Sequence, residues 1–176
     1  MRILTVRQPW AWAIIHGGKN VENRVRNIAG DYRGPVLIHV AKAYAVDWQS
    51  DTLARLMNRH PGVHEDPQPW HAQAGEIIGV VDLVDAHHET SDRCGDSVGF
   101  CSDWAERGAH HLVLANPRAL DQPIPYKGAL GLRKTEFFVS GDWLGEYVTP
   151  DHSSCTPYGC PPSCYSEPAA RLVATS

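Results

Sequence analysis

Two short apolar segments place the strongest constraint on how this chain folds. Residues 33–41 contain the run Val-Leu-Ile-His-Val, and residues 77–84 read Ile-Ile-Gly-Val-Val-Asp-Leu-Val. Continuous apolar runs of this length, rich in β-branched residues, predict strands that are buried on both faces. Gly79 lies inside the second run and predicts a β-bulge or a close approach of another backbone. We therefore place residues 77–84 at the centre of a sheet.

The other segments predict a small mixed sheet with flanking helices. Further strands are predicted at residues 3–6, 20–25, 111–115 and 136–139. Helices are predicted at residues 9–16, ahead of the paired glycines 17 and 18, and at residues 46–58. Loops that contain proline are predicted at residues 59–75, 116–118 and 123–128. Five or six strands without regular strand-helix alternation favour an α+β fold whose sheet closes into a barrel.

The length and the C-terminal composition predict one domain followed by a tail. A chain of 176 residues is typical of one domain, which we assign to residues 1–147. Residues 148–176 contain five prolines, several serines and three of the five cysteines, which predicts an irregular or disordered tail. No apolar run approaches the roughly 18 residues of a membrane span. We expect a cytoplasmic protein with reduced thiols and no membrane partner.

Charge is distributed unevenly along the chain. Residues 1–45 hold seven basic and two acidic residues, whereas the rest holds nine basic and eighteen acidic residues. This polarity predicts an anionic ligand near the N-terminal segment, although a solvated basic face would give the same pattern. A sequence pI near 6.2 lacks the global basicity of a strong, sequence-blind nucleic-acid binder. A nucleic acid would therefore be held locally.

The segment from Gly17 to Arg24 carries the first candidate site. Alternation along residues 20–25 predicts that Glu22 and Arg24 share one face of a strand, with Lys19 reaching the same pocket from the preceding turn. One carboxylate between two cations suits anion binding or proton transfer. The alternative interpretation is a structural ion pair of Glu22 with Arg24, beside a solvated Lys19.

A second candidate site is the run Arg7-Gln8-Pro9-Trp10. These residues lie where a predicted strand meets a predicted helix, so an anion or a base edge could bind there. Trp10 and Trp12 have the side chains to stack on a base. Burial in the core is the alternative for both tryptophans, and it is favoured more for Trp12 than for Trp10.

Histidines and cysteines give a weaker metal signal. The tail holds His152, Cys155, Cys160 and Cys164, a set that zinc accepts, but no Cys-x-x-Cys pair is present and ordinary reduced cysteines are the favoured interpretation. The pairs His87-His88 and His110-His111 are interpreted as surface or loop histidines, because adjacent residues do not reach one site. We assign neither a metal nor another cofactor to the candidate sites.

Taken together, these segments resemble the ASCH (activating-signal-cointegrator homology) domains, relatives of the PUA domain. The resemblance is carried by Val6-Arg7-Gln8-Pro9-Trp10-Ala11, by Gly17-Gly18-Lys19-Asn20-Val21-Glu22-Asn23-Arg24, by residues 32–39 and 75–84, by Asn116-Pro117-Arg118, and by residues 124–132. It implies a PUA-like β-barrel beside a cleft that recognises RNA or a nucleotide. Lys127, in the matching Lys-Gly-Ala-Leu-Gly loop, could face the same cleft, and a turn lysine in solvent is the equal alternative.

The resemblance implies two kinds of enzyme as well. Some ASCH proteins resemble ribonucleases of single-stranded RNA, and a small subgroup is similar to amidohydrolases that remove the acetyl group of N4-acetylcytidine. Lys19 matches a catalytic lysine of that subgroup, but Glu22 stands where the subgroup has a threonine. In either enzyme, Lys19, Glu22 and Arg24 would form the catalytic group, with a water held by Glu22 in the amidohydrolase case.

Three functions follow from this sequence, and the residues leave open whether the chain is an enzyme. The favoured function is an RNA- or nucleotide-binding protein with a cationic cleft formed by Arg7, Gln8, Pro9, Trp10, Lys19, Arg24, Arg33 and Lys127. An RNA-directed hydrolase that uses the same cleft is the second. A protein-interaction domain in a transcription or translation complex is the third. The expected partner is RNA or a modified nucleoside or nucleotide, and protein partners stay unknown.

Overall fold

The computed structural model describes residues 1–45, 54, 58, 73–95, 100–146 and 168–174. These ranges contain nine strands and, besides the single helical residues 54 and 58, one helix. In chain order the elements are β1 (Arg2–Val6), α1 (Trp10–His16), β2 (Val21–Arg24), β3 (Gly34–Val40), β4 (Glu76–His88), β5 (His110–Pro125), β6 (Leu132–Lys134), β7 (Phe137–Ser140), β8 (Trp143–Glu146) and β9 (Pro168–Ala174). The described fold is therefore mostly β.

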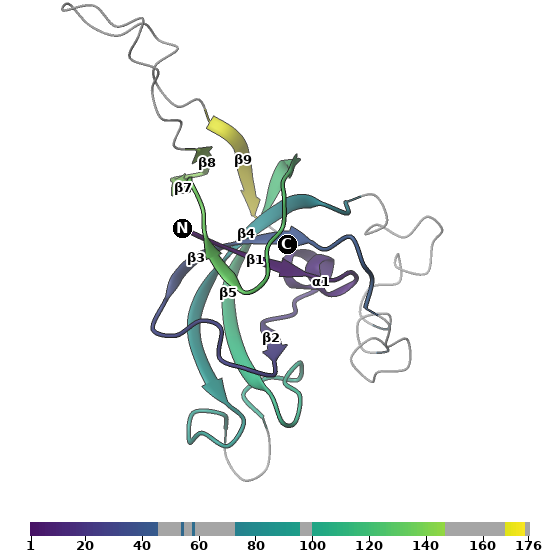
Figure 1. Cartoon of the computed structure of the whole chain (residues 1–176), viewed down its shortest axis with the longest axis vertical. Coiled ribbons are helices and arrows are strands. Elements are labelled where there is room, and N and C mark those ends of the chain that lie inside the picture. The colour runs from purple at the N-terminus through teal and green to yellow at the C-terminus, as the bar shows by residue number, and fades with distance from the viewer. Residues whose placement is uncertain (46–53, 55–57, 59–72, 96–99, 147–167, 175–176) are drawn as a thin grey trace, which may run out of the picture.

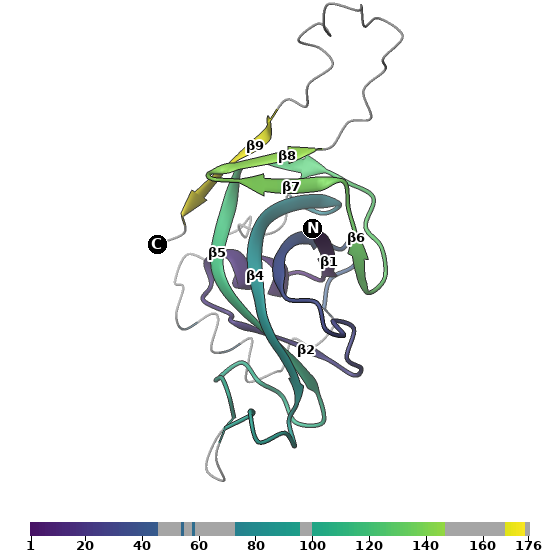
Figure 2. The same ribbon diagram turned by 90° about the vertical axis from the view of Figure 1, so that its left-hand side faces the viewer.

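The strands form one strongly curled sheet (Figure 1 and Figure 2). Its order is β6-β1-β3-β4-β5-β9-β8-β7, and β2 pairs with β5 beside this path. Strands β1 and β3 run parallel, whereas the other pairs in the described ranges are antiparallel. The curled β-rich sheet agrees with the predicted fold class, but the prediction of five or six strands is wrong because nine are present.

Helix α1 packs its apolar face on the sheet. Ala11, Ala13, Ile14 and Ile15 are buried, and Ile14 and Ile15 join the main core with residues of β1, β3, β4 and β5. The helix ends where predicted, because the backbone N–H of Gly17 donates to the Ala13 carbonyl. The Lys19 N–H donates to the same carbonyl at 2.9 Å, which directs the chain into β2.

At Gly79, the backbone of β5 and the helix α1 both come close to the backbone of β4. A Cβ at this position would lie 2.6 Å from the Arg118 carbonyl oxygen of β5 and 2.6 Å from Ile15 Cδ1 of α1. The pairing of β4 with β5 also shifts register between Ile77 and Gly79. Both features predicted for Gly79, a bulge and a close approach, are confirmed.

Strand β5 overturns two predicted loops. A turn was expected at residues 116–118, and an extended loop at residues 123–128, but β5 runs from His110 to Pro125 through the first and into the second. Asn116 takes a left-handed backbone conformation with φ of 50°, and register shifts against β4 absorb the irregularity. A bulged strand can thus carry turn residues when its partner is long enough to pair on both sides of the bulge.

Part of the predicted tail belongs to the sheet. Pro168–Ala174 forms β9, which pairs with β5 and with β8. Ala170 and Leu172 are buried in a second core cluster with Phe137 and Leu144. The prediction of an irregular segment is therefore wrong for these seven residues.

Other predictions fall on ranges that the structure does not describe. The helix expected at residues 46–58 can be compared only at positions 54 and 58, both helical, and the loop expected at 59–75 only at positions 73–75. His152, Cys155, Cys160 and Cys164 also lie outside the described residues. Among the helical residues that are described, no segment has the length and apolar character needed to cross a membrane.

Candidate functional site

A cleft of about 1200 Å³ lies beside the ends of β1, β2 and β3. Four basic side chains and one carboxylate line it: Arg7, Arg24, Lys42, Lys127 and Glu22. Trp10, His39 and Tyr126 add ring surfaces to the same wall. The cleft therefore combines an excess of positive charge with rings on which a planar ligand can stack.

Glu22 is the centre of an ion-pair network in this cleft. Its Oε1 atom lies 3.0 Å from Arg24 Nη2, and its Oε2 atom lies 3.4 Å from Lys19 Nζ. Arg24 also donates to the Thr5 carbonyl at 2.9 Å, which ties β2 to the end of β1. The expected proximity of Lys19, Glu22 and Arg24 is thus observed, and Glu22 and Arg24 both border the cleft.

Lys19 lies behind Glu22 rather than in the cleft. It is 4% exposed, it is not among the cleft-lining residues, and its ammonium donates to the Val21 carbonyl. Burial lowers the pKa of Lys19, and the nearby Glu22 carboxylate opposes this effect. The alternative interpretation of a solvated Lys19 is therefore wrong. Glu22 and Arg24 are the members of the network that a ligand in the cleft can contact.

The second predicted group divides between the cleft and the core. Arg7 and Trp10 line the cleft, as does the separately predicted Lys127. Gln8 is 1% exposed and accepts a hydrogen bond from the Trp12 N–H at 3.0 Å, and Pro9 is buried. Gln8 and Pro9 are thus not brought to the cleft, and they shape the start of α1 instead. Trp12 packs against a small core cluster, as its favoured interpretation predicts.

Arg33 lies apart from the other predicted residues. Its guanidinium is 3.2 Å from Asp85 Oδ1 and donates to the Gly30 and Tyr32 carbonyls. It does not appear among the residues that line the cleft. The parallel register of β1 with β3 explains this, because the cleft lies at the Val6–Val40 end and Arg33 precedes the opposite end. We therefore remove Arg33 from the candidate site.

The sequence analysis missed His39 as a cleft residue. His39 is 3% exposed, yet it borders the cleft, and its Nε2 lies 3.1 Å from the Tyr126 carbonyl oxygen. Burial lowers the pKa of His39, so the ring is neutral at pH 7 and Nε2–H donates to that carbonyl. Gly128 permits this packing, since a Cβ there would lie 2.6 Å from His39 Nδ1. A single histidine inside the apolar run 33–41 was the available signal.

The side chains best suited to a metal lie elsewhere in the described structure. His87, Cys94, Cys101 and His111 gather at the far ends of β4 and β5. The interpretation of His87 and His111 as surface or loop residues is wrong, because they are 5% and 0% exposed. His87 lies opposite His111, and His88 lies opposite His110. Strand alternation therefore turns His87 and His111 inward and places His88 and His110 on the other face.

A family model of the ASCH domain matches residues 4–124. The chain belongs to the ASCH domain family. This confirms the resemblance inferred from the sequence, and proteins of this family are generally RNA-binding. The matched residues include Arg7, which follows β1, Trp10 of α1, and Glu22 and Arg24 of β2. Lys127 lies three residues beyond the match.

Proposed function

We propose that this protein binds RNA or a nucleotide in the cleft beside β1, β2 and β3. The observation that carries the proposal is the set of four basic side chains around the single carboxylate of Glu22. Guanidinium and ammonium groups hold phosphate, and a buried carboxylate accepts hydrogen bonds from an exocyclic amine. In this proposal the curled sheet corresponds to the PUA-like barrel that the family resemblance implies.

The positions of the side chains suggest a division of roles. Arg7, Lys42 and Lys127 lie on the cleft wall, where they would contact phosphates. Trp10 is half-buried and borders the cleft, so its free ring surface would stack on a base. Glu22 is held from behind by Lys19 and from the side by Arg24, which fixes its carboxylate before any ligand arrives.

We predict that Arg7→Ala and Lys127→Ala each weaken binding of a labelled single-stranded RNA, measured by fluorescence anisotropy over a series of salt concentrations. Each lost phosphate contact should lower the magnitude of the negative slope of log affinity against log salt by about 0.7. Arg33→Ala is the matched control, because it removes an arginine that does not line the cleft. Equal losses of RNA affinity in Arg7→Ala and Arg33→Ala would contradict binding of RNA in the proposed cleft. Salt-independent binding would instead favour the protein-interaction function.

Hydrolysis in the same cleft is a second candidate function. The observation that favours it is the contact of Glu22 with a buried lysine whose pKa is lowered. Glu22 would act as the base that activates a water or a ribose hydroxyl, and Arg24 would stabilise negative charge that develops on the substrate. Lys19, which is buried, would position the Glu22 carboxylate. Glu22 would then pass the proton that it takes from the nucleophile to the leaving group.

The hydrolase function is tested by incubating the protein with single-stranded RNA and, separately, with N4-acetylcytidine, and analysing both mixtures by mass spectrometry. If the cleft is catalytic, Glu22→Gln should abolish product formation and retain binding, because it removes the base but keeps a similar shape. Arg33→Ala should form product at the wild-type rate. No product from the wild-type protein, together with retained RNA, would leave a binding protein.

A further inference from the structure

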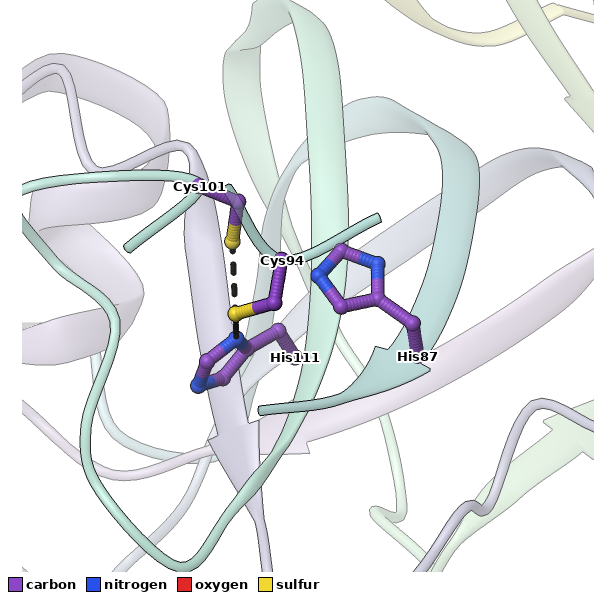
Figure 3. Close-up of side chains that lie close together, drawn as sticks. All are labelled: His87, Cys94, Cys101 and His111. Carbon is purple, nitrogen blue, oxygen red and sulfur yellow. Dashed lines mark hydrogen bonds between the residues drawn. The ribbon is translucent and has the colours of Figure 1, made fainter. Parts of the chain in front are cut away.

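We propose that His87, Cys94, Cys101 and His111 bind a structural Zn²⁺ ion, which joins the ends of β4 and β5 to the loop between them. Each residue supplies one ligand atom, and the four atoms all lie within 4.8 Å of one another. Figure 3 shows the four side chains directed toward one another. Two thiols and two imidazoles are a ligand set that zinc takes in tetrahedral structural sites.

The distances agree with such a site. His111 Nδ1 lies 3.2 Å from Cys94 Sγ and 3.4 Å from Cys101 Sγ. Zinc bonds of about 2.3 Å to sulfur and about 2.0 Å to nitrogen place tetrahedral ligands about 3.5 Å apart. The thiols and the imidazole therefore need only small movements to surround one ion. His87, Cys94 and His111 are also buried, which protects the bonds from water.

His87 presents a nitrogen that lacks a partner. Its Nδ1 atom lies 2.9 Å from Asp85 Oδ2, whereas its Nε2 atom is buried without a hydrogen-bond partner among the described residues. The ring nitrogen farther from the main chain points toward Cys94 (Figure 3). A proton on Nδ1, held by Asp85, leaves the Nε2 lone pair free for a metal. A bound ion would satisfy this otherwise costly buried atom.

His111 is oriented in the complementary way. Its Nε2 atom lies 2.9 Å from the Glu106 carbonyl oxygen, so Nε2–H donates there and Nδ1 turns its lone pair to the thiols. Asp85, the partner of His87, is itself held by Arg93 at 2.9 Å and by Arg33 at 3.2 Å. Histidine ligands of metals typically donate their second N–H to a carboxylate or a carbonyl, and both histidines do so here.

Four protein ligands leave no open coordination position, which indicates a structural role rather than a catalytic one. The loop that carries Cys94 and Cys101 also carries Trp104, which is 2% exposed and packs with Ala13 and Val21. Asn23 of β2 donates to the Trp104 carbonyl at 2.8 Å and accepts from the Glu106 N–H at 3.1 Å. The ion would thus hold this loop against β2, the strand that presents Glu22 and Arg24 to the cleft.

The direct test is the metal content of the reduced, full-length protein after saturation with Zn²⁺ and removal of free metal. We expect about one zinc ion per chain and, after exchange, the visible absorption of tetrahedral Co²⁺ with thiolate ligands. Cys94→Ser and His111→Ala should lose this stoichiometric ion. His88→Ala and His110→Ala are matched controls, because these rings contact each other with centroids 4.8 Å apart and stand outside the cluster. Both controls should keep the ion.

A second variant keeps the test informative if the ligand variants do not fold. Asp85→Asn retains all four ligands but weakens the acceptor for His87 Nδ1–H. It should lower zinc affinity roughly 10- to 100-fold, measured by competition with a chromogenic chelator. Wild-type affinity in Asp85→Asn would contradict the assignment of His87 as a ligand through Nε2.

Three results would overturn the proposal. One is a reduced wild-type protein that binds neither Zn²⁺ nor Co²⁺. Another is full zinc content in both Cys94→Ser and His111→Ala. The third is a zinc ion that is lost only when Cys155, Cys160 and Cys164 are replaced together by serine, which would assign the metal to the tail.

Discussion

Glu22→Leu is expected to lower the free energy of unfolding by about 3–5 kcal/mol at pH 7. The substitution removes the carboxylate that contacts both Lys19 and Arg24. Arg24 keeps its hydrogen bond to the Thr5 carbonyl and some contact with water. The Lys19 side chain is only 3% exposed, and of the contacts described above it keeps the hydrogen bond to the uncharged Val21 carbonyl. A buried charge whose partner is removed is costly because its desolvation is no longer compensated. Urea unfolding of both proteins measures the difference.

The loss should shrink as the pH rises, because Lys19 can release its proton. Its folded-state pKa is lowered, so between that value and the unfolded value the unfolded chain binds more protons and stability increases with pH. We expect a smaller deficit of Glu22→Leu at about pH 9.5 than at about pH 6. Glu106 and Arg24, the other charges near Lys19, remain in both proteins.

A double variant separates the lost ion pair from lost packing. Lys19→Met with Glu22→Leu removes both charges and should recover most of the stability that Glu22→Leu alone loses. The same deficit in the single and double variants, or a deficit that does not vary with pH, would contradict the argument. In either case the contribution of Glu22 would be one of shape rather than charge.

Gly79→Val is the second substitution with a large expected effect, a loss of about 3 kcal/mol or more in the free energy of unfolding. Even its Cβ would lie 2.6 Å from the Arg118 carbonyl oxygen, which belongs to the backbone of β5 and cannot rotate away. The two branches of valine would press further against Ile15. The helix and the two longest strands meet at this position, so the strain cannot be relieved at the surface.

The matched control for Gly79 is an exposed glycine. Gly108→Ala meets no atom within 4 Å, but its φ of +70° carries the ordinary left-handed penalty of about 1 kcal/mol. Thermal unfolding and urea titration should therefore give a much lower stability for Gly79→Val than for Gly108→Ala. Ile15→Val in the Gly79→Val background should recover part of the loss by removing Cδ1. Equal stability of the two single variants would show that β4 and β5 can separate without cost.

Elements with a strong local signal were predictable from the sequence. Strand β1, helix α1 and strand β3 follow directly from apolar runs, from Pro9 before the helix and from Gly17 after it. The part of β5 at residues 111–115 was predicted, but its continuation to Pro125 was not. Asn116 and Pro117 are typical of a turn, and only pairing with β4 carries the strand through them. Strand β9 was missed for the same reason, since its stability comes from distant residues such as Phe137 and Leu144.

The candidate cleft was partly predictable. Arg7, Trp10, Glu22, Arg24 and Lys127 were named from the sequence, and all five line the cleft. Arg33 was named as well, but the parallel pairing of β1 with β3 places it at the opposite end of the sheet. The burial of Lys19 was also not predictable from spacing, because the loop around Trp104 and Glu106 that packs near β2 comes more than 80 residues later.

What the sequence determined by itself is the local chemistry: which apolar runs form strands such as β1, β3 and β4, and which carboxylate of β2 stands between which cations. Those properties depend on residues two to four positions apart, which the chain holds together in any fold. Tertiary structure alone decided which distant residues meet. His87 faces His111 because of the register of β4 with β5, and two cysteines of the connecting loop complete that cluster. Register is a property of paired strands, and a shift of either strand by one residue would have turned its own histidine to the other face.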